Sequence, residues 1–180
     1  MTIREGADRL ISETGLTELL QRYGDPYVTG SYYMDMMVWN DLDVYLRADE
    51  SSFDIYGMIA AINAAMRPFR FDGIIQPEEK RLCYGFETRI SGERWNVDIW
   101  IKDSESIHRS HDFCDSIVRR LENAPAKRQA VLDIKAGLIQ MGLYGFDKDP
   151  RRHYHSHEIY SAVLEEDISS LAVFLERHPL

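Results

Sequence analysis

The chain has 180 residues, of which 44% are hydrophobic and 28% are charged, and its formal net charge is −9. This length accommodates one domain, or a domain with a small helical appendage, and the composition suffices for a hydrophobic core. The acidic balance argues against a nucleic-acid partner, because binding through phosphates depends on clustered Lys and Arg. It does not exclude a nucleotide, since a bound divalent cation can neutralise the phosphates.

Two cysteines, Cys83 and Cys114, lie in apolar segments. Such cysteines are typical of buried free thiols in a reducing compartment. The first ten residues contain no apolar signal segment, and no apolar run approaches the length of a membrane span. We therefore expect a cytoplasmic protein without a membrane anchor, and the sequence leaves a homodimer open.

The first third of the chain alternates helical and extended patterns. Helical spacing of apolar residues predicts two short helices in residues 4–22, followed by a turn at residues 24–26. Residues 27–31 form the first expected strand and its end. Residues 32–40 are too apolar for an exposed loop, so we expect a short helix there, with two of its methionines and Val38 packed inward.

The middle of the chain predicts four further strands and a helix. Residues 41–47 alternate polar and apolar side chains, which indicates a strand with one apolar face. A helix ending near Met66 and a strand at residues 69–75 follow. The clearest hairpin joins residues 82–90 to residues 95–101, because apolar side chains alternate on both sides of a Ser-Gly turn.

From Ser104 onward the apolar spacing is helical throughout. It predicts helices at residues 104–121 and 126–141, and one or two short helices after about Ser156. The expected fold class is therefore α+β, with an α+β domain in residues 1–103 and a helical C-terminal region in residues 104–180.

Two acids in the second expected strand suggest a metal site. Asp41 and Asp43 are two residues apart, so both side chains project from the same face of the strand. Adjacent carboxylates repel each other unless a proton or a cation lies between them. The pair therefore predicts a divalent-metal site.

A third acid, Asp98, stands among bulky apolar residues in the second strand of the hairpin. A charged side chain is costly in free energy when it is buried without a partner. A strand with one solvated face, on which Asn96 and Asp98 simply meet water, explains this position equally well. Three carboxylates from two neighbouring strands are nevertheless what two Mg²⁺ ions need to clamp a triphosphate and an attacking hydroxyl.

Four features now carry a family resemblance: Gly30-Ser31 at the end of a strand, nine intervening residues, Asp41-Leu42-Asp43-Val44, and the later segment Val97-Asp98-Ile99. In this order and spacing the chain resembles the nucleotidyltransferase superfamily, typified by DNA polymerase β and the antibiotic nucleotidyltransferases. The resemblance covers roughly residues 27–101. It implies a mixed sheet flanked by helices, followed by a helical region that shapes the acceptor site.

The resemblance also implies a role for each motif residue. Asp41 and Asp43 would bind both metal ions, Mg²⁺ or Mn²⁺, while Asp98 would be the third ligand and help to deprotonate the acceptor. Gly30 and Ser31 would hold the β- and γ-phosphates of a nucleoside triphosphate at a helix start. The implied reaction is in-line attack by the acceptor on the α-phosphate, with pyrophosphate leaving.

The function that we expect is transfer of a nucleoside monophosphate, AMP from ATP, to a hydroxyl of a small-molecule acceptor. The acidic surface suits a cationic acceptor. Two alternatives stay open: transfer to a protein side chain, as in toxin–antitoxin-type members, and a binding module whose catalytic site has decayed.

One departure from the family pattern favours the decayed module. Many small members carry an arginine shortly after the Gly-Ser pair, whereas this chain has an acid, Asp35, and no arginine there. The charge of a triphosphate would then be met by metal ions and by a more distant base. Arg89, Arg94 and Lys102 are the candidates.

Six histidines raise the separate hypothesis of a zinc site. His108 and His111 are three residues apart on an expected helix, and His153, His155 and His157 alternate in a loop. Neither cysteine is placed to complete a zinc-binding pattern. Surface histidines, or a wall of the acceptor pocket, fit these positions better.

Overall fold

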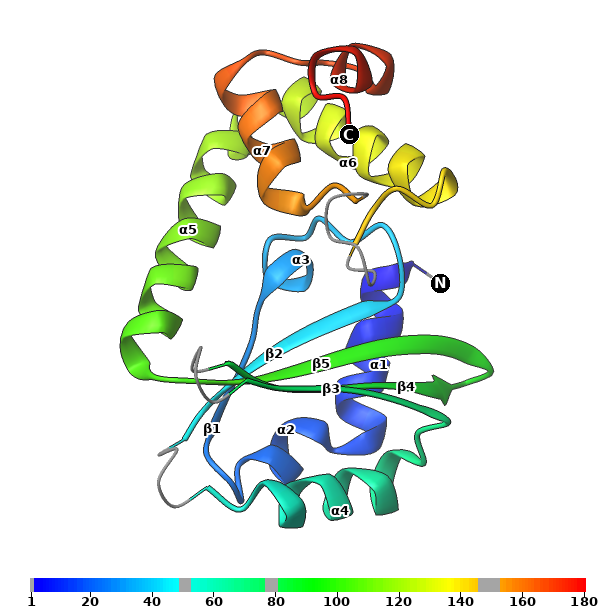
Figure 1. Ribbon diagram of the computed structural model, residues 1–180, viewed down its shortest axis with the longest axis vertical. Helices are drawn as coiled ribbons and strands as arrows, with labels where there is room; N and C mark the ends of the chain where they lie inside the picture. Colours follow the sequence, from blue (N-terminus) through cyan, green and yellow to red (C-terminus); the bar gives the residue numbers. More distant parts are fainter. Residues whose placement is uncertain (1, 49–52, 77–80, 146–152) are drawn as a thin grey trace. The chain divides into compact units, whose positions relative to one another are not determined.

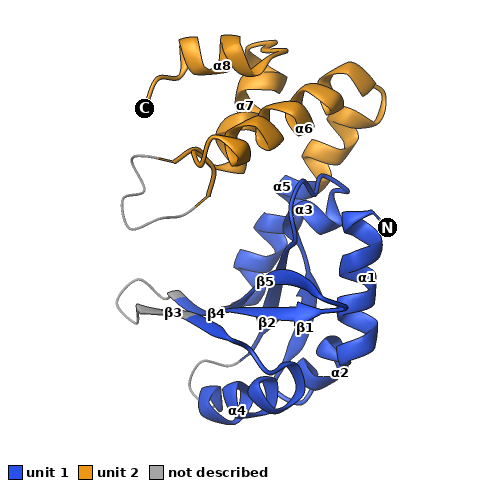
Figure 2. Ribbon diagram, turned by 90° about the vertical axis from the view of Figure 1, so that its right-hand side faces the viewer, with its two compact units in different colours: residues 1–114 blue, residues 115–180 orange. Residues whose placement is uncertain are grey.

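The structure is a computed structural model that describes residues 2–48, 53–76, 81–145 and 153–180. It contains two compact units, Met1–Cys114 and Asp115–Leu180, which Figure 2 shows in different colours. Helix α5 (Ser104–Glu122) runs from the first unit into the second. The domain boundary expected between residues 103 and 104 stays a prediction. No helix among the described residues is long and apolar enough to cross a membrane.

The first unit holds the sheet and the helices that flank it. Before α5, its elements in chain order are α1 (Ile3–Thr14), α2 (Leu16–Leu20), β1 (Asp25–Val28), α3 (Gly30–Tyr33), β2 (Asp41–Arg47), α4 (Ile55–Met66), β3 (Arg70–Gln76), β4 (Arg81–Ile90) and β5 (Glu93–Lys102). Apart from the helix expected at residues 32–40, the elements predicted from apolar spacing are confirmed.

Five strands form one mixed sheet in the order β1-β2-β5-β4-β3. β2 and β5 run parallel, whereas the other neighbouring strands are antiparallel. The predicted hairpin joins β4 to β5, with Ile90 paired to Glu93 at its end. Since β2 and β5 are far apart in sequence, their parallel pairing requires the crossover that α4, β3 and β4 provide.

One face of the sheet is apolar and packs against α1, α2 and α4. Figure 1 shows α2 and α4 below the sheet and α3 above it. The residues of β2 and β5 on the apolar face are fully buried, namely Leu42, Val44, Leu46, Val97, Ile99 and Ile101. Burial of apolar surface stabilises the unit by about 25 cal/mol per Å². The intervening residues of both strands, which include the three acids, therefore lie on the opposite face.

The segment after β1 differs from the expectation. α3 ends at Tyr33, and residues 34–40 form turns and irregular structure instead of a helix. Asp35 has a φ of 54°, in the left-handed region, which interrupts a right-handed helix. Met34 and Met36 are nevertheless 8% and 1% exposed. The apolar character of this segment therefore reflects burial, not helix formation.

The second unit is helical, as the sequence predicts, and it has its own core. After the end of α5 its helices are α6 (Pro125–Gln140), α7 (Ser156–Glu165) and α8 (Leu171–Arg177). α6 packs against both α7 and α8, and Phe174 of α8 is fully buried.

A lysine is buried in this helical unit. Lys135, on α6, is 1% exposed, and its Nζ lies 5.8 Å from the ring centroids of both Tyr144 and Tyr160. A buried ammonium group is costly unless nearby groups compensate the charge, and the faces of aromatic rings do so in part. The burial of Lys135 was not predicted from the sequence, although a lysine inside an apolar helical stripe is a visible signal.

The packing of α1 against the sheet generates a test of the fold. A Cβ atom added to Gly6 would lie 2.7 Å from Cζ2 of Trp95, a buried ring. Glycine to alanine in a helix interior normally stabilises by about 1 kcal/mol, but overpacking a core costs about 1–3 kcal/mol. We expect Gly6→Ala to lower the free energy of unfolding, measured by urea denaturation.

Gly137→Ala on α6 is the matched control for this substitution. Its added Cβ would meet Cδ2 of Leu171, the far end of a flexible side chain that can rotate away. The control should leave stability unchanged or slightly raised. A stabilising effect of Gly6→Ala would contradict the described packing of α1 on Trp95.

Candidate active site

The register of β2 and β5 brings the predicted acids onto one patch of the sheet. Asp43 pairs with Asp98, and Asp41 pairs with Asn96. Neighbouring strands lie about 4.8 Å apart, and the four side chains project from the face opposite the α1–α2–α4 layer. Each of the four residues is partly buried.

Asn96 links two of the carboxylates. Its Nδ2 donates to Oδ1 of Asp41 at 2.7 Å and to Oδ2 of Asp98 at 3.2 Å. One amide group thereby provides the two hydrogens that partly compensate the charges of two neighbouring carboxylates. From the sequence, Asn96 was expected only as a solvated residue, because the strand that pairs with β5 on this side was not known.

Carboxylate oxygens on one face of two adjacent strands suit Mg²⁺ or Mn²⁺, which prefer oxygen ligands. Within the described parts of the chain, however, no group of three or more His, Cys, Asp or Glu side chains is close enough together to hold a metal ion. The backbone register is favourable, since residues directly opposite on paired strands are about 4.8 Å apart. To share a cation, the carboxylate side chains would therefore have to rotate, but the strands would not have to move.

The predicted phosphate turn lies directly against Asp43. Gly30 has a φ of 62°, and a Cβ atom at this position would lie 2.5 Å from Oδ2 of Asp43. The backbone N–H of Thr29 donates to the carbonyl oxygen of Asp43 at 3.0 Å. Glycine is required at position 30 for both reasons, the left-handed conformation and the close approach. Ser31 follows it in α3, and its carbonyl oxygen accepts from the N–H of Met36 at 2.8 Å.

Helix α1 holds this turn from one side. The guanidinium of Arg4 lies 3.7 Å from the centroid of the Tyr32 ring and donates a hydrogen bond to the Tyr32 carbonyl oxygen. The Tyr32 hydroxyl donates to Oδ1 of Asp8 at 2.7 Å. Burial and this hydrogen bond raise the pKa of Tyr32. Arg4 thus places a cation beside the turn that has no following arginine in the sequence.

Helix α5 holds the turn from the other side. The ring of Tyr33 stacks on His111, with centroids 5.7 Å apart and an interplanar angle of 6°. Tyr27 of β1 meets the same imidazole edge-on at 5.6 Å. The two tyrosines that follow the Gly-Ser pair, Tyr32 and Tyr33, therefore fix α3 between α1 and α5.

Tyr45 continues the polar row on β2. Its hydroxyl accepts a hydrogen bond from Ser110 of α5 at 3.2 Å. Burial is the main cause that raises the pKa of Tyr45, and the negative charge of Asp43 adds to it. The phenol therefore stays neutral at physiological pH.

The three bases suggested by the sequence lie on β4 and β5. Arg94 forms an ion pair with Glu87, with Nε 2.5 Å from Oε2. Arg89 and Lys102 lie over aromatic rings. Arg4 is a further candidate for the base that meets the charge of a triphosphate. Sequence spacing cannot identify it, because its proximity to the Gly-Ser turn depends on the packing of α1.

The histidine segment has a structural role. His155 is the N-cap of α7, and its backbone N–H donates to Oε2 of Glu158 at 2.7 Å. The rings of His155 and His157 stack with centroids 5.8 Å apart. Cys83 and Cys114 are free and buried, as expected.

No protein-family model matches the sequence, and no characterised protein matches it. Solved structures do match its fold. The Cid1 poly(U) polymerase has a TM-score of 0.65 at 13% identity, over 91% of this chain and 50% of that chain. The polymerase core of TRAMP, an RNA surveillance complex, has a TM-score of 0.64 at 17% identity, over 95% and 50%. Terminal uridylyl transferase 4 from Trypanosoma brucei has a TM-score of 0.56 at 13% identity, over 91% and 54%.

These similarities confirm the expected fold class, a nucleotidyltransferase fold with a mixed sheet and C-terminal helices. The chain spans about half the length of the solved structures it matches. At 13% to 17% identity the likeness shows the fold alone. The roles of Asp41, Asp43, Asp98, Gly30 and Ser31 stay predictions.

The bridge made by Asn96 generates a test of the site. Asn96→Ala removes two hydrogen bonds to carboxylates, which contribute about 1.5–3 kcal/mol each when a partner is charged. We expect the metal-free variant to have a lower free energy of unfolding in urea. Millimolar Mn²⁺ should restore much of that loss, because a cation between the carboxylates takes over the compensation of their charges.

Asn40→Ala is the control for Asn96→Ala. Asn40 donates to the backbone carbonyl of Arg94 at 3.0 Å, so the loss of this bond should not respond to Mn²⁺. Asn96→Asp should be the least stable variant without metal and gain the most from it. An Asn96→Ala loss that Mn²⁺ leaves unchanged would contradict a cation site at these carboxylates.

Proposed function

We propose that the chain is a metal-dependent nucleotidyltransferase, which moves a nucleoside monophosphate from a nucleoside triphosphate to a hydroxyl group. The observation that carries this proposal is the parallel register of β2 and β5. It sets Asp43 opposite Asp98 and leaves Asp41 one step along the same face. The contact between Gly30 and Asp43 adds a candidate phosphate turn at the same place, in a fold that nucleotide polymerases share.

Each residue has a defined task in the proposed reaction. Asp41, Asp43 and Asp98 hold the divalent cations, Mg²⁺ or Mn²⁺, which when bound neutralise phosphate charge and lower the pKa of the attacking hydroxyl. Asp98 accepts the proton of that hydroxyl. The hydroxyl oxygen forms a bond to the α-phosphorus as the bond to the bridging oxygen breaks, and pyrophosphate leaves.

The α3 turn positions the other end of the triphosphate. Backbone N–H groups that follow Gly30, together with the Ser31 hydroxyl, are donors for the β- and γ-phosphates. Arg4 supports this turn through Tyr32, and its guanidinium places a positive charge against the turn. Most of the rate gain comes from orientation and charge compensation.

ATP is the first candidate for the nucleotide, and UTP is the second. Two of the matched structures are named as a poly(U) polymerase and a uridylyl transferase, which supports testing both nucleotides.

The first candidate for the acceptor is a hydroxyl of a small molecule, as the sequence suggests. The net charge of −9 suits a cationic compound. An RNA 3′ hydroxyl is a second candidate, supported by matched structures that are named for RNA. A protein side chain remains the third.

Thermal unfolding with nucleotide and metal tests the proposal. Ligand at a hundred-fold excess over Kd stabilises the folded state by about 2.7 kcal/mol, which raises Tm by about 5–10 °C for a protein of this size. We expect this shift with Mg²⁺ plus ATP or UTP. Asp41→Asn/Asp43→Asn should abolish it and lower transfer of labelled nucleotide at least about a hundred-fold.

Asp133→Asn/Glu176→Gln is the matched control, because it also removes two negative charges but on the helical unit. The Asp41/Asp43 variant should be at least as stable as the parent without metal, because two repelling carboxylates have been removed. No shift with any nucleotide and metal, or an equal shift in both variants, would overturn the proposed activity.

A further inference from the structure

Phenylalanine side chains are exposed at the edge of the sheet. β3 is the edge strand, and Phe69 and Phe71 are 51% and 54% exposed. Exposed large apolar side chains that lie close together mark contact surfaces more often than isolated ones do. Phe71 stacks on Tyr84, with centroids 6.3 Å apart, whereas the neighbours of Phe69 are arginines.

Three arginines gather around Phe69. The Cζ atoms of Arg89 and Arg94 lie 5.4 Å and 5.9 Å from its ring centroid. Arg70 and Arg94 both pair with Glu87, whose side chain is 12% exposed, while their own side chains are 62% and 58% exposed. One carboxylate therefore anchors two guanidinium groups and leaves them accessible. We call Phe69, Arg70, Arg89 and Arg94 the Phe69 surface.

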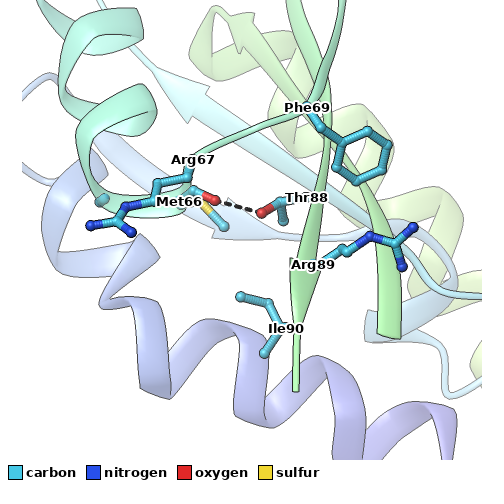
Figure 3. A pocket seen from close by; sticks show the side chains of 7 residues that line it. Met66, Arg67, Phe69, Thr88, Arg89 and Ile90 are labelled. Carbon is cyan, nitrogen blue, oxygen red and sulfur yellow. Dashed lines mark hydrogen bonds between the residues drawn. The ribbon is translucent and has the colours of Figure 1, made fainter. Parts of the chain in front are cut away.

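A cavity of about 600 Å³ adjoins this surface, between the end of α4 and β4. Arg67, Phe69 and Arg89 are among the residues that line it. Figure 3 shows Phe69 and Arg89 on one side of the cavity and Arg67 pointing away from them on the other. Thr88, in its wall, donates a 2.5 Å hydrogen bond to the carbonyl oxygen of Met66, which leaves that hydroxyl bound to the protein.

We propose that the Phe69 surface binds single-stranded RNA. Guanidinium groups match phosphate in charge and geometry, and an exposed aromatic ring stacks on an unpaired base. A base inside a duplex is already stacked and paired, so the ring selects single strands. The surface groups three arginines with one largely buried carboxylate, Glu87, in a chain whose net charge is −9.

The position of the surface suits the acceptor of the proposed reaction. Glu87, the anchor of Arg70 and Arg94, pairs directly with Asn96 in the β4–β5 register. Arg94 lies on β5, the strand that carries Asp98, whereas Arg89 lies on β4 and Arg70 on β3. RNA binding by the Phe69 surface does not depend on the proposed function. Only the further step does, in which the 3′ end of the bound RNA strand is the acceptor held beside the acids.

Binding of a fluorescent oligouridylate of about 15 nucleotides, followed by anisotropy without metal or nucleotide, tests the surface. Phe69→Ala should weaken binding about ten-fold, the loss of roughly one stacked base. Arg89→Gln/Arg94→Gln should reduce the slope of log K against log salt by about 1.4, since each phosphate contact on a single strand contributes about 0.7.

An exposed aromatic residue and two exposed arginines outside the Phe69 surface provide the controls. Tyr56→Ala removes a side chain that is 80% exposed on α4, and Arg119→Gln/Arg177→Gln removes two exposed arginines of the helical unit. Both should bind RNA as the parent does. Thermal unfolding of every variant checks that the fold is kept.

Three results would overturn the inference: no binding at low salt, binding that the Phe69 and arginine substitutions leave unchanged, and equal affinity for a duplex of the same length. A change of oligomeric state in Phe69→Ala would assign the surface to a second copy of the chain instead. Asp41→Asn/Asp43→Asn should bind the oligonucleotide normally, so loss of catalysis and loss of RNA binding are separable outcomes.

Discussion

The parallel pairing of β2 with β5 is the constraint on which the candidate site depends. Its register sets Asp43 against Asp98 and Asp41 against Asn96, and the burial of the alternate residues fixes which face the acids occupy. A slip by one residue would turn one strand's acids into the apolar core, where an unpaired carboxylate is costly. The core and the candidate site are thus two consequences of one backbone arrangement, and the same sheet carries the Phe69 surface on β5, β4 and β3.

At the α3 turn, a tertiary contact places a basic side chain beside a segment that has no arginine of its own. The sequence has no arginine after Gly30-Ser31, which favoured a decayed module. In the structure Arg4 reaches the same turn from α1, and Tyr33 packs on His111 of α5. The turn is therefore anchored on both sides and has a cation beside it. The absence of the local arginine no longer separates an enzyme from a binding module.

Local patterns predicted most of the fold because alternation and helical spacing report burial directly. They identified the strands that carry Asp41, Asp43 and Asp98, and the hairpin that presents Asp98. They failed at residues 32–40, where buried methionines suggested a helix that Asp35 interrupts. The bridge by Asn96 and the position of Arg4 were out of reach, because both depend on which distant segments pack together. The metal ligands themselves stay a prediction from the motif.

The proposed function requires that Asp41, Asp43 and Asp98 share a divalent cation. A crystal structure of the protein grown with Mn²⁺ and a non-hydrolysable nucleoside triphosphate, with anomalous data at the manganese edge, tests it most directly. We expect an anomalous peak within about 2.0–2.4 Å of an oxygen of each of the three carboxylates, with the triphosphate against Gly30 and Ser31. Absence of manganese from these carboxylates, with ordered nucleotide bound elsewhere, would contradict it.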